Sequence, residues 1–217
     1  MGIFGKSAPY QVILEPFDPL IGFNASFCSP NIETLHMKEK FSSFKDVDIA
    51  IKNEAGQQVL TCHCKGGSFT NKKEFRDAQG TPLFTVRAMP ASQVKQGFEA
   101  MDGTHLCTAL KKFSMSAFRM TISLQNLVAA ASNAQSSEHS GELELECKGN
   151  WSGTSATIAV AGTDKVLGHI TESMRDPDGG KYDGKRTYTV AIAPGVDYAF
   201  MAALCICFDE AYHESTK

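Results

Sequence analysis

The sequence predicts a mainly β fold, in which a closed antiparallel barrel surrounds a helix supplied by its own C-terminus. A β-hairpin unit repeats along the first half of the chain, and strand-like alternation of apolar and polar residues continues into the second half. The chain then enters an apolar run, residues 198–208, which has no polar face. A helix that is apolar on every side must be enclosed by protein or lipid, and this run is too short to span a bilayer. The sheet should therefore close around it.

The repeated unit begins with a glycine. Gly56, Gly80 and Gly103 each follow a polar stretch and precede two turn-like residues, an aliphatic residue, a second apolar residue and a threonine. A looser copy at Gly162 carries one extra residue before its apolar pair. Glycine adopts positive φ without steric cost, and the Asp and Asn residues nearby favour turns. Because strand-length apolar runs flank these turns, each unit predicts a β-hairpin.

Alternation along the returning strands indicates which side faces the interior, because successive side chains point to opposite faces. One face is uniformly apolar and often small. We assign to the interior Leu60, Cys62, Cys64, Phe84, Val86, Cys107 and Ala109. The opposite face, which includes His63 and Arg87, should point outward.

The second half of the chain predicts further strands with longer connections. Strand-like alternation covers residues 119–124, 142–147, 157–160 and 187–192. Residues 129–141 are small and polar, and residues 172–186 are charged and rich in glycine, so both predict loops.

The C-terminal helix is expected over residues 197–212. Pro194 and Gly195 break the preceding strand, and Asp197 is a suitable N-cap because its carboxylate accepts hydrogen bonds from the first helical N–H groups. The alanine content and length of the run favour a helix over another strand.

Composition excludes several classes of protein. Hydrophobic residues make up 42% and charged residues 21% of the 217 residues, as in an ordinary globular protein. The net charge of −3 provides no global basic field, so nucleic acid is not an expected partner. No apolar run is long enough for a transmembrane helix.

The cysteines and the N-terminus predict a cytoplasmic protein. The seven cysteines are odd in number and lack a compact spacing, and no signal peptide is visible, so we expect reduced thiols. Residues 1–9 should be a flexible terminus ahead of a single domain over residues 10–217. Acylation of Gly2 is left open, because Lys6 occupies the position where the myristoylation motif has Ser or Thr.

No catalytic residue, cofactor or metal site is predicted, and we do not expect an enzyme. Cys62-His63-Cys64 is the nearest approach to a metal motif, but His63 should face away from the two cysteines, and zinc spacing is absent. The sequence also lacks a nucleophile elbow and a phosphate-binding glycine loop. Among the thiols, the inward cysteines should react slowly, and Cys28, in a loop-like segment, should be labelled first.

The chain resembles the LURP-one-related proteins, which share a superfold with tubby C-terminal domains and phospholipid scramblases. The resemblance rests on residues 196–202 (Val-Asp-Tyr-Ala-Phe-Met-Ala), on residues 148–151 (Lys-Gly-Asn-Trp), on the repeated turns and on the entry segment 18–37, which fits the family's opening strand. It covers roughly residues 10–212. The resemblance implies a closed antiparallel barrel, which leaves no free strand edge, of about twelve strands around a hydrophobic C-terminal helix.

The resemblance implies less about function, because fold alone does not determine it. The favoured interpretation is a non-enzymatic binding or scaffold module, whose partner could be an unidentified protein. The alternative is a membrane-surface module, scramblase-like, that binds anionic phospholipid or phosphoinositide headgroups. The basic residues that could serve such binding are Lys72, Lys73, Arg76, Lys111 and Lys112. Acidic neighbours such as Glu74 and Asp77 dilute these clusters.

Overall fold

The computed structural model describes residues 12–38, 46–65, 72–89, 95–112, 118–131, 141–150, 154–173 and 187–213. The described strands are β1 (Glu33–Lys38), β2 (Val47–Asn53), β3 (Gln58–Cys64), β4 (Lys73–Asp77), β5 (Pro82–Ala88), β6 (Lys95–Ala100), β7 (His105–Lys112), β8 (Phe118–Asn126), β9 (Gly141–Gly149), β10 (Ser155–Val160), β11 (Val166–Ser173) and β12 (Thr187–Ile192). The described helices are the 3-10 helix η1 (Ala25–Phe27), α1 (Leu127–Ala131) and α2 (Tyr198–His213).

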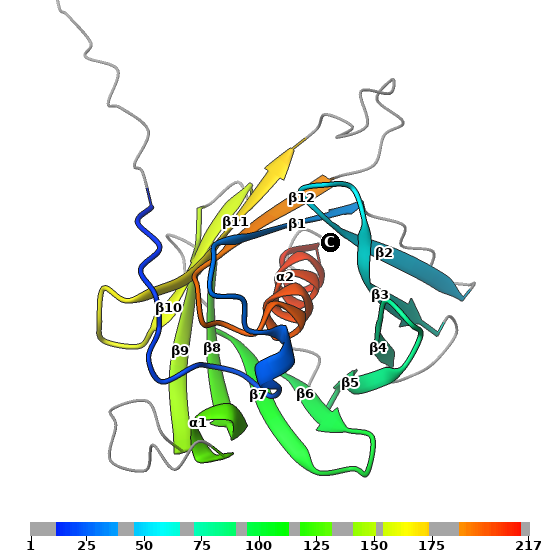
Figure 1. The fold of residues 1–217 in the computed structure, drawn as a ribbon, viewed down its shortest axis with the longest axis horizontal. Coiled ribbons are helices and arrows are strands. Elements are labelled where there is room, and N and C mark those ends of the chain that lie inside the picture. Colours follow the sequence, from blue (N-terminus) through cyan, green and yellow to red (C-terminus); the bar gives the residue numbers. More distant parts are fainter. Residues whose placement is uncertain are drawn as a thin grey trace, which may run out of the picture.

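The twelve strands form one closed barrel in which each strand pairs with its neighbours in sequence (Figure 1). Every pairing is antiparallel, and β1 closes the barrel by pairing with β2 on one side and with β12 on the other. The predicted fold class and the strand number implied by the resemblance are therefore confirmed.

The repeated hairpin unit has the same turn geometry in its first three copies. In the turn between β4 and β5, the Asp77 N–H donates to Thr81 O and the Gly80 N–H donates to Asp77 O. Equivalent pairs of bonds close the turns at Gly56 and Gly103, and all three glycines have φ between 75° and 88°. In the looser copy at Gly162, the Val160 N–H donates to Lys165 O, so this turn contains one more residue than the other three. Positive φ explains the glycine in each copy.

Helix α2 runs through the middle of the barrel and supplies much of its core (Figure 1). It begins within one residue of the expected position, and Phe200 through Leu204 are fully buried. The barrel wall comes very close to α2 at Gly168 of β11, where a Cβ would lie 2.6 Å from Met201 Cε. A glycine at this position of the wall thus makes room for the helix.

Three regions differ from the sequence-based expectations. The predicted loop 172–186 begins too early, because β11 continues through Ser173. The predicted loop 129–141 begins too early, because α1 continues through Ala131 and buries Val128 and Ala129. Likewise, residues 18–32 are not part of an opening strand. They form an irregular segment containing η1, because Asn24 caps this short helix and Gly22 has a φ of 147°.

Several expectations fall on residues that the structure does not describe. Residues 1–9, residues 132–140 of the first predicted loop and residues 174–186 of the second lie outside the described ranges. So does the tryptophan of the 148–151 run.

Candidate functional site

Asp197 connects the start of α2 to the N-terminal segment that crosses this end of the barrel. Its Oδ1 accepts hydrogen bonds from Ala199 N–H at 2.9 Å and Phe200 N–H at 3.1 Å. Its Oδ2 accepts from Phe23 N–H at 3.0 Å and Asn24 N–H at 3.1 Å. Burial raises the pKa of Asp197, and the four backbone donors oppose that shift. The expected N-cap is confirmed, and it also anchors a distant segment.

A pocket of about 530 Å³ lies at this end of the barrel, which we call the η1 end. Its apolar lining includes Phe23, Phe27, Leu83, Phe84, Leu106 and Leu127. Aromatic contacts hold part of this lining in place, since the Phe23 ring centroid lies 4.9 Å from that of Phe200 and 5.5 Å from that of Phe84. The pocket is therefore built on the rigid junction between the N-terminal segment and the barrel.

The two carboxylates in this pocket accept hydrogen bonds from the backbone. Asp77 Oδ1 accepts from Gln79 N–H and Thr81 N–H, and the Asp197 carboxylate accepts the four bonds described above. No lysine or arginine belongs to the described lining. The described lining accordingly combines apolar side chains with two carboxyl groups.

A second pocket of about 490 Å³ lies beside residues 13–18 and the turn between β10 and β11. It is more polar, because Glu15, Asp18, Asp164 and Lys165 contribute to its lining. Mixed charges of this kind are well hydrated and make the site less suited to an apolar ligand.

The opposite end of the barrel, where α2 ends, contains a buried polar cluster. Lys73 Nζ lies 2.7 Å from Glu210 Oε2, and Gln96 Nε2 donates to the same oxygen at 3.1 Å. Gln96 Oε1 accepts from Cys207 Sγ at 2.9 Å. Burial lowers the pKa of Lys73, but the Glu210 carboxylate together with Cys207 and Cys62 outweighs this effect, and the pKa lies above its usual value. Lys73 is thus charged, and its ion pair with Glu210 holds the C-terminal end of α2 against β4.

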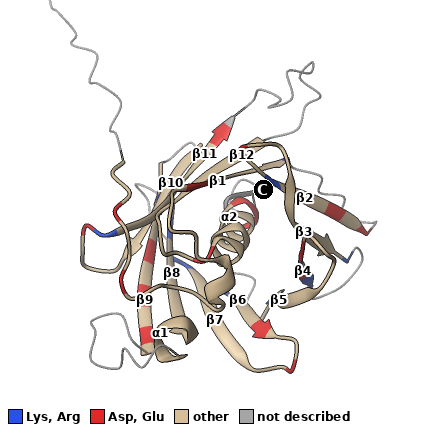
Figure 2. Cartoon of the chain, viewed as in Figure 1, with Lys and Arg blue, Asp and Glu red and all other residues tan. Residues whose placement is uncertain are grey.

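In Figure 2 helix α2 is largely tan, with acidic residues near its C-terminal end, where Asp209 and Glu210 lie. The Lys111 ammonium donates to Ala211 O at 2.5 Å, and the Tyr188 hydroxyl donates to the Asp209 carboxylate. Basic and hydroxyl groups of the wall therefore meet the polar last turns of an otherwise apolar helix.

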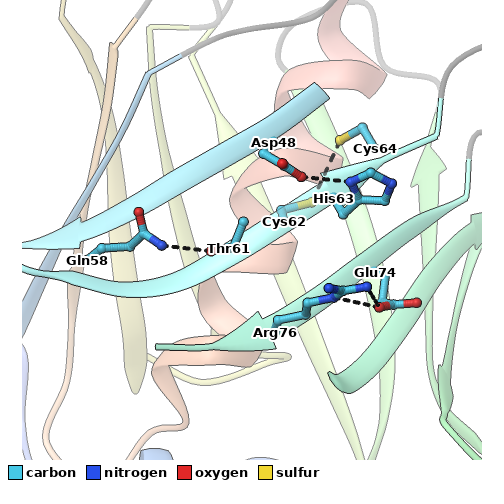
Figure 3. A network of polar contacts seen from close by, with 8 residues as sticks. All are labelled: Asp48, Gln58, Thr61, Cys62, His63, Cys64, Glu74 and Arg76. Carbon is cyan, nitrogen blue, oxygen red and sulfur yellow. Dashed lines mark hydrogen bonds and ion pairs between the residues drawn. The ribbon is translucent and has the colours of Figure 1, made fainter. Parts of the chain in front are cut away.

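The structure divides the five predicted lipid-binding residues. Lys73 and Lys111 bind residues in the last turns of α2. Arg76 forms an ion pair with Glu74 at 2.7 Å on the outer face of the barrel wall (Figure 3). Lys72 and Lys112 are exposed. The lipid-binding assignment itself stays a prediction.

The position of Lys73 could have been found from the sequence. Lys73 and Phe75 are two residues apart on one strand and hence share a face, and Phe75 is an obvious core residue. The pairing of Lys73 with Glu210 could not have been found from the sequence, because Glu210 lies far from β4 along the chain.

The residues of the Cys62-His63-Cys64 segment point as predicted. His63 faces outward, with its Nδ1 2.7 Å from Asp48 Oδ1, while Cys62 and Cys64 share the other face of β3 (Figure 3). Within the described ranges, no group of three or more His, Cys, Asp or Glu side chains could hold a metal ion.

Comparison with known proteins identifies the family. The model of the LURP-one-related family matches residues 33–209. The chain belongs to the LURP-one-related family. Among its relatives in Arabidopsis thaliana, Protein LURP1 is 25% identical over 199 residues, which cover 88% of this chain and 90% of that protein. Protein LURP-one-related 10 is 23% identical over 205 residues, with 88% and 96% covered.

A solved structure supports the fold of this LURP-one-related chain. The X-ray structure of a protein from Arabidopsis thaliana superposes with a TM-score of 0.56 at 19% identity, and the match covers 86% of this chain and 95% of the other. No helix in the described part of the chain has the length and hydropathy needed to cross a membrane.

Proposed function

We propose that this LURP-one-related barrel is a non-enzymatic binding module whose ligand is a small, largely apolar molecule that is neutral or positively charged. The observation that carries the proposal is the pocket of about 530 Å³ at the η1 end. Ligand sites are typically concavities of about 300–1,000 Å³, mostly apolar in lining, and the mouths of β-barrels are a preferred location.

The charge of the ligand follows from the polar lining. Asp77 and Asp197 contribute negative charge, and no described lining residue is basic. An anionic ligand would have to leave water without gaining a compensating cation, which is unfavourable in a partly enclosed site. An apolar body filling the space among Phe23, Leu83 and Leu106 would gain about 25 cal/mol for each Å² of apolar surface removed from water.

The first test is a titration with N-phenyl-1-naphthylamine, a neutral apolar dye whose fluorescence rises in apolar surroundings. Leu83→Trp should fill part of the pocket and weaken dye binding by about tenfold, equivalent to about 1.4 kcal/mol. The repeat provides a matched control, because Val59 occupies the equivalent position in the preceding hairpin and does not line the pocket. Val59→Trp should bind the dye as the parent chain does.

Thermal melts of both variants establish that the barrel is intact. The proposal is contradicted if the parent chain fails to bind the dye, or if Leu83→Trp binds it as well as Val59→Trp does.

A second candidate function is attachment to an anionic membrane surface through the end of the barrel where α2 ends. Exposed Lys65, Lys72 and Lys112 and half-buried Lys95 lie there, at the ends of β3, β4, β7 and β6. Among the described residues, the ion pairs do not involve these four ammonium groups. Each lysine near an anionic surface contributes about 1 kcal/mol. We expect weak binding that salt abolishes.

Co-sedimentation with phosphatidylserine vesicles, with and without phosphoinositide, tests this second function. The double variant Lys72→Glu/Lys112→Glu should lower vesicle binding at low salt by about tenfold or more. Lys165→Glu, in the turn at the opposite end, should have little effect. Equal binding by both variants would exclude this surface, and headgroup-selective binding that persists at about 150 mM salt would show a specific lipid site instead.

A further inference from the structure

The two cysteines of β3 lie in contact at the end of the barrel where α2 ends. Cys62 Sγ and Cys64 Sγ are 3.7 Å apart (Figure 3). Cys62 is fully buried, whereas Cys64, the last residue of the strand, is only half-buried. A strand rises about 3.3 Å per residue, so the two Cα atoms are about 6.6 Å apart, near the upper limit of about 6.8 Å for a disulfide. A modest movement of the strand end would allow the sulfurs to bond.

Cys64 differs chemically from the other cysteines. The hydrogen bond from Cys62 lowers the pKa of Cys64, burial opposes this effect, and the Lys73 ammonium assists it from the next strand, where Lys73 is the register partner of Cys64. Burial raises the pKa of Cys62 well above its ordinary value. Of the two sulfurs, Cys64 is therefore the one that loses its proton more readily.

The remaining thiols are protected by burial. It raises the pKa of Cys28 and Cys147 to about 12, and it raises the pKa of Cys107, Cys205 and Cys207 as well. The thiolate is the reactive form of cysteine. The sequence-based expectations are that Cys28 reacts first and that Cys64 reacts slowly. We favour Cys64 instead, because it combines partial exposure with a lysine neighbour.

We propose that Cys64 is a site of oxidation by hydrogen peroxide and that Cys62 resolves the product as a reversible disulfide. In the first step, the Cys64 thiolate attacks one peroxide oxygen and the O–O bond breaks. The products are a sulfenic acid on Cys64 and hydroxide, which takes a proton to become water. In the second step, the Cys62 sulfur attacks the Cys64 sulfur and the S–O bond breaks. The Cys62 proton leaves with that oxygen as a second water.

The balance is two thiols and one peroxide converted to one disulfide and two waters, with two electrons passing from sulfur to oxygen. Because the Cα separation is near the permitted limit, the disulfide should be strained. Strained disulfides are more readily reduced than relaxed structural ones. Such a pair is suited to reversible modification.

The experiment treats the full chain with hydrogen peroxide and follows it by intact mass and peptide mapping. The parent chain should lose about 2 Da as one Cys62–Cys64 disulfide, and dithiothreitol should reverse the change. Cys62→Ala should instead accumulate a sulfenic acid on Cys64 that dimedone traps. Cys64→Ala should lose the rapid reaction altogether. Cys28→Ala, which removes the other half-buried thiol, should behave as the parent chain does.

Peptide mapping of the peroxide-treated parent chain tests the proposal even if a variant folds poorly. First modification at Cys28, or peroxide reactivity of Cys64 no greater than that of the five buried thiols, would overturn the proposal. So would an oxidised product whose disulfide joins any other pair.

Discussion

Leu204→Asp is expected to abolish folding of the barrel. Leu204 lies in the middle of α2 with no exposed surface, and its neighbours along the helix are equally buried. The substitution removes an apolar side chain and places a carboxylate in an interior that offers it no cation. An uncompensated buried charge costs several kcal/mol, comparable to the whole stability of a typical domain, about 5–15 kcal/mol. The measurements are yield in the soluble fraction and a thermal melt followed by circular dichroism.

The matched control is Leu127→Asp on α1, because Leu127 is 40% exposed and its new carboxylate would remain in water. Removal of residues 194–217 should have the same effect as Leu204→Asp, since it empties the barrel of its helix. A Leu204→Asp chain that melts cooperatively would show that α2 does not occupy the core.

Asp197→Asn is expected to lower the free energy of unfolding by about 3 kcal/mol or more. Asparagine has one side-chain oxygen, whereas both Asp197 oxygens accept two backbone N–H bonds each. The amide nitrogen of the variant would face two donors, and each unsatisfied buried group costs about 1–3 kcal/mol. Urea denaturation gives the change directly.

The control is Asp102→Asn in the turn between β6 and β7. Asp102 Oδ1 accepts a hydrogen bond from Thr104 N–H, but the carboxyl group is exposed to solvent, so the variant should unfold at nearly the parent urea concentration. If Asp197→Asn shifts the midpoint no more than Asp102→Asn does, the carboxylate is not the anchor that its contacts indicate.

The parts of the fold that the sequence predicts are those with local causes. Positive φ at Gly56 and Gly80 places the hairpin turns, and alternation then assigns Leu60 and Phe84 to the core. The apolar helix was predictable because every side of it is hydrophobic. Its N-cap was predictable because Asp197 follows a Pro-Gly break.

What sequence reasoning missed depends on contacts between distant segments. The pocket at the η1 end exists because the Phe23 and Asn24 N–H groups donate to Asp197, 174 and 173 residues away. Lys73 appears in the sequence as part of a basic cluster, yet Glu210 holds it inside the barrel. Neither pairing leaves a periodic signal along the chain.

The pairing of β1 with β12 has a consequence for synthesis of the protein. Glu33 lies opposite Ile192, so the strand that closes the barrel is made long after the strand it closes onto. At translation rates of about 5–20 residues per second, roughly 10–30 s separate the two. During this interval the nascent sheet has two free edges and an apolar face that α2 has yet to cover. Such edges pair readily with other chains, so until β12 and α2 have been made the growing sheet is open to mispairing that the closed barrel excludes.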